Sequence, residues 1–121
     1  MGLREKESEM AERFHAHDIA LEMAVALRSA LDQIAQRDRD LTDQIRRAAS
    51  SVVLNIAEGA RRSGKDRLQF YRIAAGSAAE VRAGLELAQA WGYLATTGQA
   101  RVETLLDRVL AMLWRLTHAR G

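Results

Sequence analysis

The sequence predicts an all-α protein, an up-down antiparallel four-helix bundle, from three observations. Proline is absent from all 121 residues, whereas domains rich in strands and turns usually place several prolines in their turns. Alanine, leucine, arginine and glutamate are abundant, and these residues favour helices. Apolar residues recur at helical spacing in four segments, and four amphipathic helices with short connections pack as a bundle. A chain of this length forms one domain.

The first two helices are predicted over residues 10–35 and 41–58. The apolar face of the first consists of Ala24, Leu27, Leu31 and Ile34. The apolar stripe of the second consists of Leu41, Ile45, Ala48, Val52 and Ile56. The charged stretch between them contains Asp38 and Asp40, either of which can cap the second helix. Residues 1–9 are expected to form a flexible N-terminus or a helix extension, and residues 10–121 the single domain.

The third helix is predicted over residues 65–91, after a turn at Gly59–Gly64 in which Gly59 ends the second helix. Its stripe at alternating spacings of three and four consists of Phe70, Ala74, Ser77, Val81, Gly84, Ala88 and Trp91. Gly92 is expected to end this helix, and Thr96 or Thr97 to cap the fourth. The broad apolar face of the fourth helix consists of Val102, Leu105, Leu106, Val109, Leu110, Leu113 and Leu116.

Several classes of protein are excluded by composition. Cysteine is absent, so disulfides, thiol catalysis and cysteine-based zinc sites are not possible. The charged N-terminal stretch MGLREKESEM has no apolar core of a signal peptide, and no apolar run approaches the roughly 18 residues of a membrane span. We therefore expect a cytoplasmic protein without membrane contact.

Residues 59–66, GARRSGKD, resemble the phosphate-binding loop G-x-x-x-x-G-K but lack its final Ser or Thr. Such a loop follows a buried parallel strand, whereas the residues upstream continue one helical stripe without a breaker. Asp66 replaces the hydroxyl that would hold magnesium and would place a negative charge beside the phosphates. We therefore interpret the stretch as a connection between two helices, and we expect no nucleotide cofactor.

Basic residues cluster around this connection. From Arg46 to Arg72 there are seven basic and two acidic residues, a net charge of +5, whereas the whole chain carries +2 and the remainder therefore −3. Because arginine pairs well with phosphate, the cluster is a candidate nucleic-acid-binding site. We call its central part, from the connection itself, the basic turn: Arg61, Arg62, Lys65 and Arg67.

A second basic row is predicted on the fourth helix, where a spacing of seven places three arginines on one side. The row consists of Arg101, Arg108 and Arg115, with Glu103 and Asp107 beside it. It is a second candidate for nucleic-acid binding. The alternative for both clusters is an ordinary solvated helix surface.

A polar network is predicted between the second and third helices, where it would hold the register of the two. It consists of Arg46, Arg47, Ser51, Asn55, Glu58, Ser77 and Glu80. Antiparallel pairing would place Glu80 opposite Arg46 or Arg47, as an ion pair across the helices. Acid–base catalysis by the two carboxylates is the alternative. His15 and His17 point to different sides of a helix and His118 stands alone, so no metal site is expected.

The sequence resembles a known family. The stretches QIRRAASSVVLNIAEG, FYRIAAGSAAEV and WGYL, with the basic turn between the first two, are similar to the four-helix proteins encoded in intervening sequences of bacterial 23S rRNA genes. The accessory protein of diversity-generating retroelements belongs to the same family. The resemblance covers residues 41–94. Members usually have a Phe-Pro pair before the second helix, where this chain has Asp-Arg-Asp, and a turn one residue longer with a second glycine.

The resemblance implies a homopentameric barrel of bundles, no known catalytic activity, and for some members a basic surface that engages RNA or a reverse transcriptase. We therefore expect a non-enzymatic oligomer that binds RNA or a nucleoprotein partner. The alternative is a purely structural or protein-interaction module whose arginines serve its own subunit contacts. Trp114 lies beside the apolar face of the fourth helix and is expected to face a neighbouring subunit.

Overall fold

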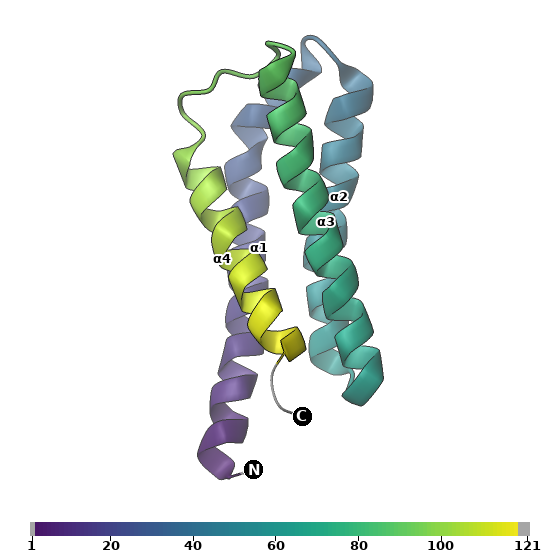
Figure 1. Ribbon diagram of the computed structural model, residues 1–121, viewed down its shortest axis with the longest axis vertical. Helices are drawn as coiled ribbons and strands as arrows, with labels where there is room; N and C mark the ends of the chain where they lie inside the picture. Colours follow the sequence, from purple (N-terminus) through teal and green to yellow (C-terminus); the bar gives the residue numbers. More distant parts are fainter. Residues whose placement is uncertain (1, 119–121) are drawn as a thin grey trace.

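Four antiparallel helices lie along one long axis, as Figure 1 shows for the computed structural model, which describes residues 2–118. In chain order the helices are α1 (Leu3–Ala35), α2 (Arg39–Arg61), α3 (Gly64–Ala90) and α4 (Ala100–His118). Each helix packs against its two neighbours around a square, since α1 contacts α2 and α4, and α3 contacts the same two. The described residues include no strand, and the predicted all-α fold is confirmed.

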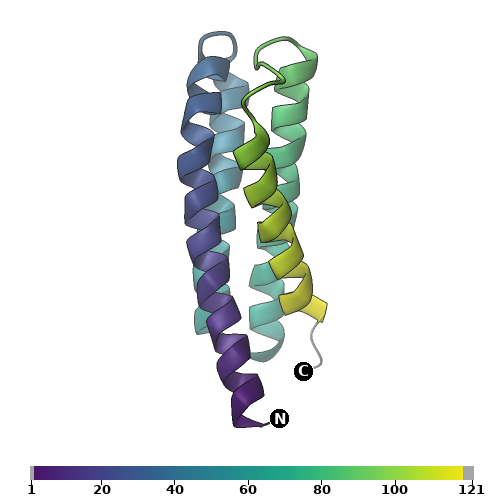
Figure 2. The same cartoon turned by 90° about the vertical axis from the view of Figure 1, so that its left-hand side faces the viewer.

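The first helix is longer than the apolar pattern predicts. It begins at Leu3 rather than at residue 10, and this end of α1 extends past the α2–α3 connection in Figure 2. The residues from Leu3 to Ser8 are all exposed. Residue 1 and residues 119–121 of the expected domain ranges lie outside the described residues. No helix among residues 2–118 combines the length and the hydropathy that a membrane crossing requires.

The core is aliphatic apart from one aromatic side chain, Tyr71, which lies near the α2–α3 connection. The predicted faces of α1, α2 and α4 are largely buried, but the predicted stripe of α3 is wrong at both ends. Phe70 is only half-buried and Trp91 is exposed, while Tyr71 and Leu85 are in the core. The helix is rotated relative to the prediction, so that part of the predicted stripe, Ser77 and Gly84, is half-buried against α2.

Glycines let α2 and α3 approach closely, and this is the most extensive helix pair of the bundle. A Cβ on Gly84 would lie 2.6 Å from Ile45 Cγ1, and a Cβ on Gly59 would lie 2.6 Å from Tyr71 Cε1. The prediction that Gly59 ends α2 is therefore wrong. Gly59 is a buried residue within the helix, and its missing side chain makes room for the Tyr71 ring.

The Tyr71 hydroxyl is buried and has no hydrogen-bond partner among the described residues. Burial raises the pKa of this phenol above its ordinary value, and the nearby positive charges of Arg13 and Arg67 oppose that rise. A buried polar group without a partner destabilises the folded state. Tyr71 therefore contributes to the core through the packing of its ring against Gly59 and not through a hydrogen bond of its hydroxyl.

The helix ends are determined by local chemistry. Asp38 caps α2, as predicted, by accepting a hydrogen bond of 2.9 Å from the Leu41 backbone amide. Gly92 follows α3 at φ +78°, and the Tyr93 amide donates to the Ala88 carbonyl at 2.8 Å, which is the Schellman arrangement that favours glycine. The predicted cap at Thr96 or Thr97 is wrong, because α4 begins only at Ala100.

Candidate nucleic-acid interface

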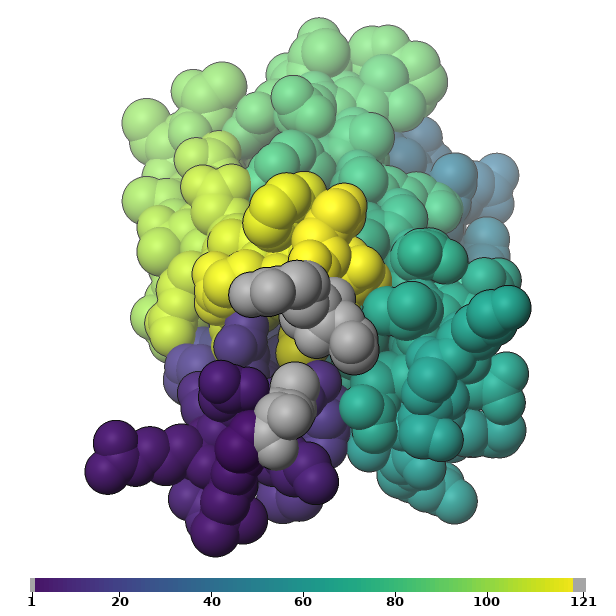
Figure 3. Space-filling model, turned by 60° about the horizontal axis from the view of Figure 1, so that its bottom comes forward, coloured from purple at the N-terminus to yellow at the C-terminus, as the bar shows by residue number. Residues whose placement is uncertain are grey.

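The basic turn lies at the end of the bundle that also carries the first residues of α1 and the last turn of α4. Figure 3 shows this end, with the connection from α2 to α3 in teal beside the yellow C-terminal part of α4. Six consecutive residues of the connection, 61–66, are exposed to solvent. The turn therefore presents Arg61, Arg62 and Lys65 outward.

One carboxylate, that of Glu58, partly neutralises the turn. It lies 3.5 Å from the Arg61 guanidinium and 3.3 Å from that of Arg62. The Arg61 side chain remains 80% exposed, and Arg62 also lies over the Phe70 ring, 5.2 Å from its centre. Since one carboxylate serves two arginines, a positive charge remains at this position.

Arg67 differs from the other basic residues because its side chain is mostly covered. Its Nε donates to the Arg62 carbonyl at 2.8 Å, and its guanidinium lies 3.9 Å from Glu9 of α1. The side chain is 23% exposed. Arg67 thus closes the connection and holds α1 beside it, so less of its charge is available to a ligand than the sequence predicts.

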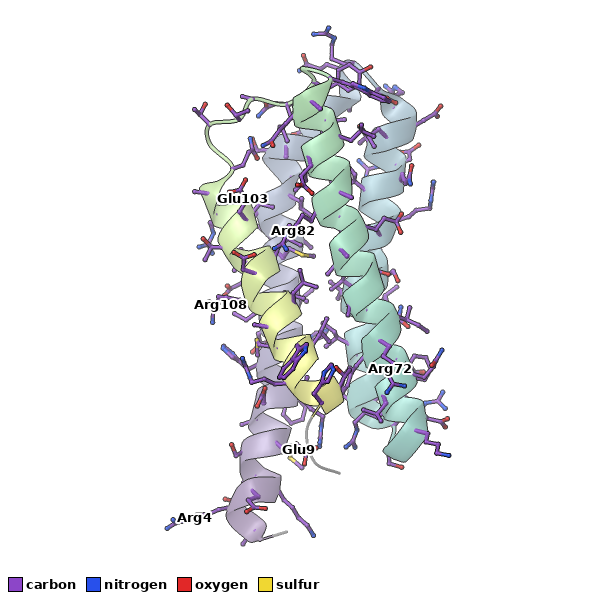
Figure 4. All side chains as sticks on the ribbon, in the orientation of Figure 1. Arg4, Glu9, Arg72, Arg82, Glu103 and Arg108 are labelled. Carbon is purple, nitrogen blue, oxygen red and sulfur yellow. The ribbon has the colours of Figure 1, made fainter. Side chains whose placement is uncertain are left out.

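Lys65 and Arg72, like Arg4 and Lys6 of α1, have no carboxylate at ion-pair distance within residues 2–118. Lys65 and Arg72 are exposed, and Figure 4 shows Arg72 near the lower end of α3. The sequence contains Arg72 in the basic cluster but its spacing does not single it out as a site residue. The absence of an intramolecular partner makes it a stronger candidate than Arg67.

The second basic row, on α4, faces α1 and is already engaged. Arg115 Nε donates to Glu12 at 2.9 Å, and Arg101 lies 3.9 Å from Glu22. Between them, Arg108 lies 3.2 Å from His15 Nε2. The row therefore links two helices along one side of the bundle. A phosphate that bound Arg101 or Arg115 would have to compete with the acidic residues of α1.

The predicted polar network is smaller in the structure. The hydroxyls of Ser51 and Ser77 lie 2.7 Å apart across α2 and α3, and Asn55 donates to the Ser51 carbonyl at 2.8 Å. These three residues form a half-buried contact between the helices, as expected. Glu58 points to the basic turn instead, where its carboxylate lies beside Arg61 and Arg62.

The predicted ion pair of Glu80 is wrong. Glu80 is exposed, and within residues 2–118 no ion pair joins it to Arg46 or Arg47. Arg46 instead lies 3.7 Å from Asp43, one turn away on its own helix. Glu80 instead lines an open groove between α2 and α3, together with Gln44 of α2.

An aromatic pair on α4 lines a groove together with Arg72 of α3, and the sequence interpretation missed it. The rings of Trp114 and His118 are stacked, with centres 4.3 Å apart and planes inclined by 12°. The spacing of four along a helix, which brings side chains together, is the signal that predicts this contact. Trp114 itself is 61% exposed. Across residues 2–118 there is no group of three or more potential metal ligands.

Comparison with known proteins places the chain in a family. The sequence profile of the 23S rRNA-intervening sequence proteins matches residues 12–115. The chain belongs to this family. The match includes all of α2 and α3 with the basic turn, and it confirms the resemblance inferred from the sequence. No curated protein matches the chain.

One solved structure similar to this chain is that of an S23 ribosomal protein family member from Bacteroides thetaiotaomicron, a protein of unknown function. The two chains share 22% sequence identity with a TM-score of 0.79, over 90% of this chain and 96% of the other. At this identity the likeness shows the fold alone. It shows that the bundle occurs without close similarity of sequence.

Proposed function

We propose that this protein is a non-enzymatic, self-associating helical protein that binds RNA, free or within a nucleoprotein, through the basic turn and Arg72. The observation that carries the proposal is the exposed end of α2 and α3, where Lys65 and Arg72 lack carboxylate partners within residues 2–118. Positive charges without internal partners attract a polyanion at little cost. The description of the family refers to 23S rRNA, and for this reason we propose RNA as the polyanion.

A binding role is favoured over catalysis by the position of the ionisable groups. None of the carboxylates and histidines in residues 2–118 is buried. Catalytic acids and bases are usually desolvated, because a site that excludes water strengthens electrostatic interactions and shifts pKa values. The polar residues of this bundle instead hold helices together or face solvent.

Self-association would make the basic turn effective. One turn offers few phosphate contacts, and such a small patch binds weakly at physiological salt. Several copies on one rigid frame act together, which multiplies affinity by roughly 10² or more. Five copies, as the family resemblance implies, would present five basic turns.

The test is a titration of wild-type protein against a structured fragment of 23S rRNA at about 50 and 200 mM salt, because phosphate contacts are salt-dependent. Lys65→Glu with Arg72→Glu should weaken binding strongly and lower the slope of log affinity against log salt by roughly 0.7–0.9 per lost contact. Arg39→Glu with Arg47→Glu is the matched control. It changes the net charge equally, at exposed positions of α2 nearer the other end of the bundle.

The control variant should bind nearly as tightly as wild type. If wild type does not bind RNA at low salt, or if both double variants lose affinity equally, the basic turn is not an RNA site. The purely structural or protein-interaction module would then be the better description, with the arginines acting within the protein.

A further inference from the structure

A groove between the lower parts of α3 and α4 combines an aromatic surface with a cation. It is lined by Arg72 and Ala75 of α3 and by Leu110, Trp114, Thr117 and His118 of α4. The volume of the groove is about 450 Å³, which lies within the range of about 300–1,000 Å³ that is typical of sites for small ligands. We call this site the α3/α4 groove.

The aromatic surface of the groove is already ordered. His118 stacks on one face of the Trp114 ring, with ring centres 4.3 Å apart. Its Nδ1 lies 2.8 Å from the Trp114 carbonyl oxygen, to which it donates, and 3.1 Å from the Thr117 hydroxyl. Trp114 is still 61% exposed, so its other face is open to solvent. A ring that is held in this way loses little conformational entropy when a flat ligand stacks on it.

The charge of the α3/α4 groove favours an anion. Arg72 has no carboxylate at ion-pair distance within residues 2–118, and no acidic residue lines the groove. Nearer the α3–α4 connection, another groove between the same helices is lined by Glu86, Glu103 and Asp107. Those carboxylates would repel a polyanion, so of these two grooves the lower one suits a ligand that carries phosphate.

The α3/α4 groove lies next to the basic turn. Lys65 and Arg72 are seven residues apart on α3, which is about two helical turns, so they lie on the same side of the helix about 10 Å apart. Both are exposed, and Figure 4 shows Arg72 on the lower part of α3. A strand of RNA whose phosphates contact these two cations therefore reaches the Trp114 ring.

We propose that the α3/α4 groove binds an unpaired nucleotide of RNA. The base stacks on Trp114, and the phosphate lies beside Arg72. Every base has an aromatic face, so the contact requires that the base is unstacked and not that it has a particular identity. The bases inside a duplex are stacked on each other and cannot enter the groove. The assignment rests on the proposed RNA binding and specifies the RNA that is preferred, namely single strands, loops and overhanging ends.

A protein surface fits the α3/α4 groove less well than a nucleotide does. A protein that covered Trp114 would also remove Arg72 from water, which costs free energy unless the partner supplies an anion. A nucleotide supplies the anion together with the flat ring. For this reason we prefer a nucleotide to the neighbouring subunit that the sequence predicts at Trp114.

The test compares Trp114→Ala with a matched control, Trp91→Ala, which removes a 56% exposed tryptophan outside the groove. Each variant is titrated with a single-stranded oligoadenylate of about ten nucleotides and with a blunt RNA duplex of the same length. Trp114→Ala should weaken binding of the single strand by about 5- to 150-fold, the fold-change equivalent to one lost base–aromatic stack. Its affinity for the duplex should not change, and its salt dependence should equal that of wild type because no phosphate contact is lost. Trp114→Phe should retain most of the affinity, and Trp91→Ala should bind like wild type.

Fluorescence measures the contact directly. The chain has two tryptophans, so Trp91→Phe leaves Trp114 as the only one. A base that stacks on this ring should quench its emission as oligoadenylate is added, whereas the duplex should change the emission little. Far-UV circular dichroism verifies the helices of each variant. If Trp114→Ala does not fold, the fluorescence titration decides alone, and an emission that stays constant overturns the assignment.

Other results would overturn the assignment in distinguishable ways. If Trp114→Ala binds the single strand like wild type, or if it loses affinity for both RNAs equally, no unpaired base stacks in the groove, although RNA binding by the basic turn stands. If Trp114→Ala has a lower mass than wild type by light scattering, a second copy of the chain covers the groove and the assignment fails. If wild type binds neither RNA at low salt, the proposed function is wrong and the site with it.

Discussion

The close approach of α2 and α3 predicts opposite effects for the same substitution at two positions of α3. Gly84 faces Ile45, and a Cβ there would lie 2.6 Å from Ile45 Cγ1 and 3.0 Å from its Cδ1. Ile45 is 1% exposed, so it has little space into which it can move. Gly76, two turns earlier, has no atom within 4 Å of the position of a Cβ. Gly84→Ala and Gly76→Ala therefore form a matched pair.

The magnitudes follow from two opposing terms. Alanine is favoured over glycine inside a helix by roughly 0.5–1 kcal/mol, so Gly76→Ala should stabilise the fold by about that amount. Gly84→Ala gains the same term but forces an extra methyl group into a packed core, which costs about 1–3 kcal/mol. The net effect of Gly84→Ala should be a loss of about 0.5–2 kcal/mol. The difference between the two variants isolates the packing cost.

Urea unfolding followed by circular dichroism measures both variants. The protein concentration has to be the same in all titrations, because self-association makes the apparent stability depend on it. If Gly84→Ala is as stable as Gly76→Ala, α2 and α3 do not pack at the distance described. If Ile45→Ala relieves most of the additional cost of Gly84→Ala in a double-mutant cycle, the contact with Ile45 is its cause.

Two further predictions concern single side chains. Tyr71→Phe should leave the protein as stable or stabilise it by about 1 kcal/mol, because it removes a buried hydroxyl without a partner. Burial favours the neutral phenol and raises its folded-state pKa. The stability difference between wild type and Tyr71→Phe should therefore be constant below the unfolded-state pKa of tyrosine, and wild type should lose stability relative to the variant as pH rises above that value. A difference in urea midpoints that does not change with pH would contradict this. Asp38→Ala should lower the free energy of unfolding by about 1 kcal/mol, because it removes the cap of α2. Asp40→Ala removes a carboxylate from the same turn but no cap hydrogen bond, so it should lower the free energy of unfolding by less. Equal free energies of unfolding for the two variants would contradict the role of the cap.

The two basic clusters show that similar residue types can have different surroundings. Arg101 and Arg115 of α4 meet acidic residues of α1, whereas Lys65 and Arg72 at the α2–α3 end meet no carboxylate in residues 2–118. Sequence charge alone treats both as polyanion sites. The partner across the bundle decides which charges remain available to a ligand.

The sequence by itself determined the class of fold, because helix formation depends on local properties that can be read along the chain. The absence of proline and the four apolar repeats predict four helices, and the cap at Asp38 and the stop at Gly92 were also correct. Each of these signals acts within a few residues. The basic turn was visible for the same reason, since its charges are consecutive.

Only the tertiary structure decided how the helices are rotated and which side chains meet across the bundle. The rotation of α3 depends on the simultaneous fit of Gly59 to Tyr71 and of Gly84 to Ile45, and these contacts join residues far apart along the chain. That rotation places Ser77 against Ser51, and Glu80 is exposed without an ion pair to Arg46 or Arg47 in residues 2–118. The pairing of α4 with α1, likewise, engaged the second arginine row. Helical periodicity shows which residues share a face, but the packing of neighbouring helices determines what each face contacts.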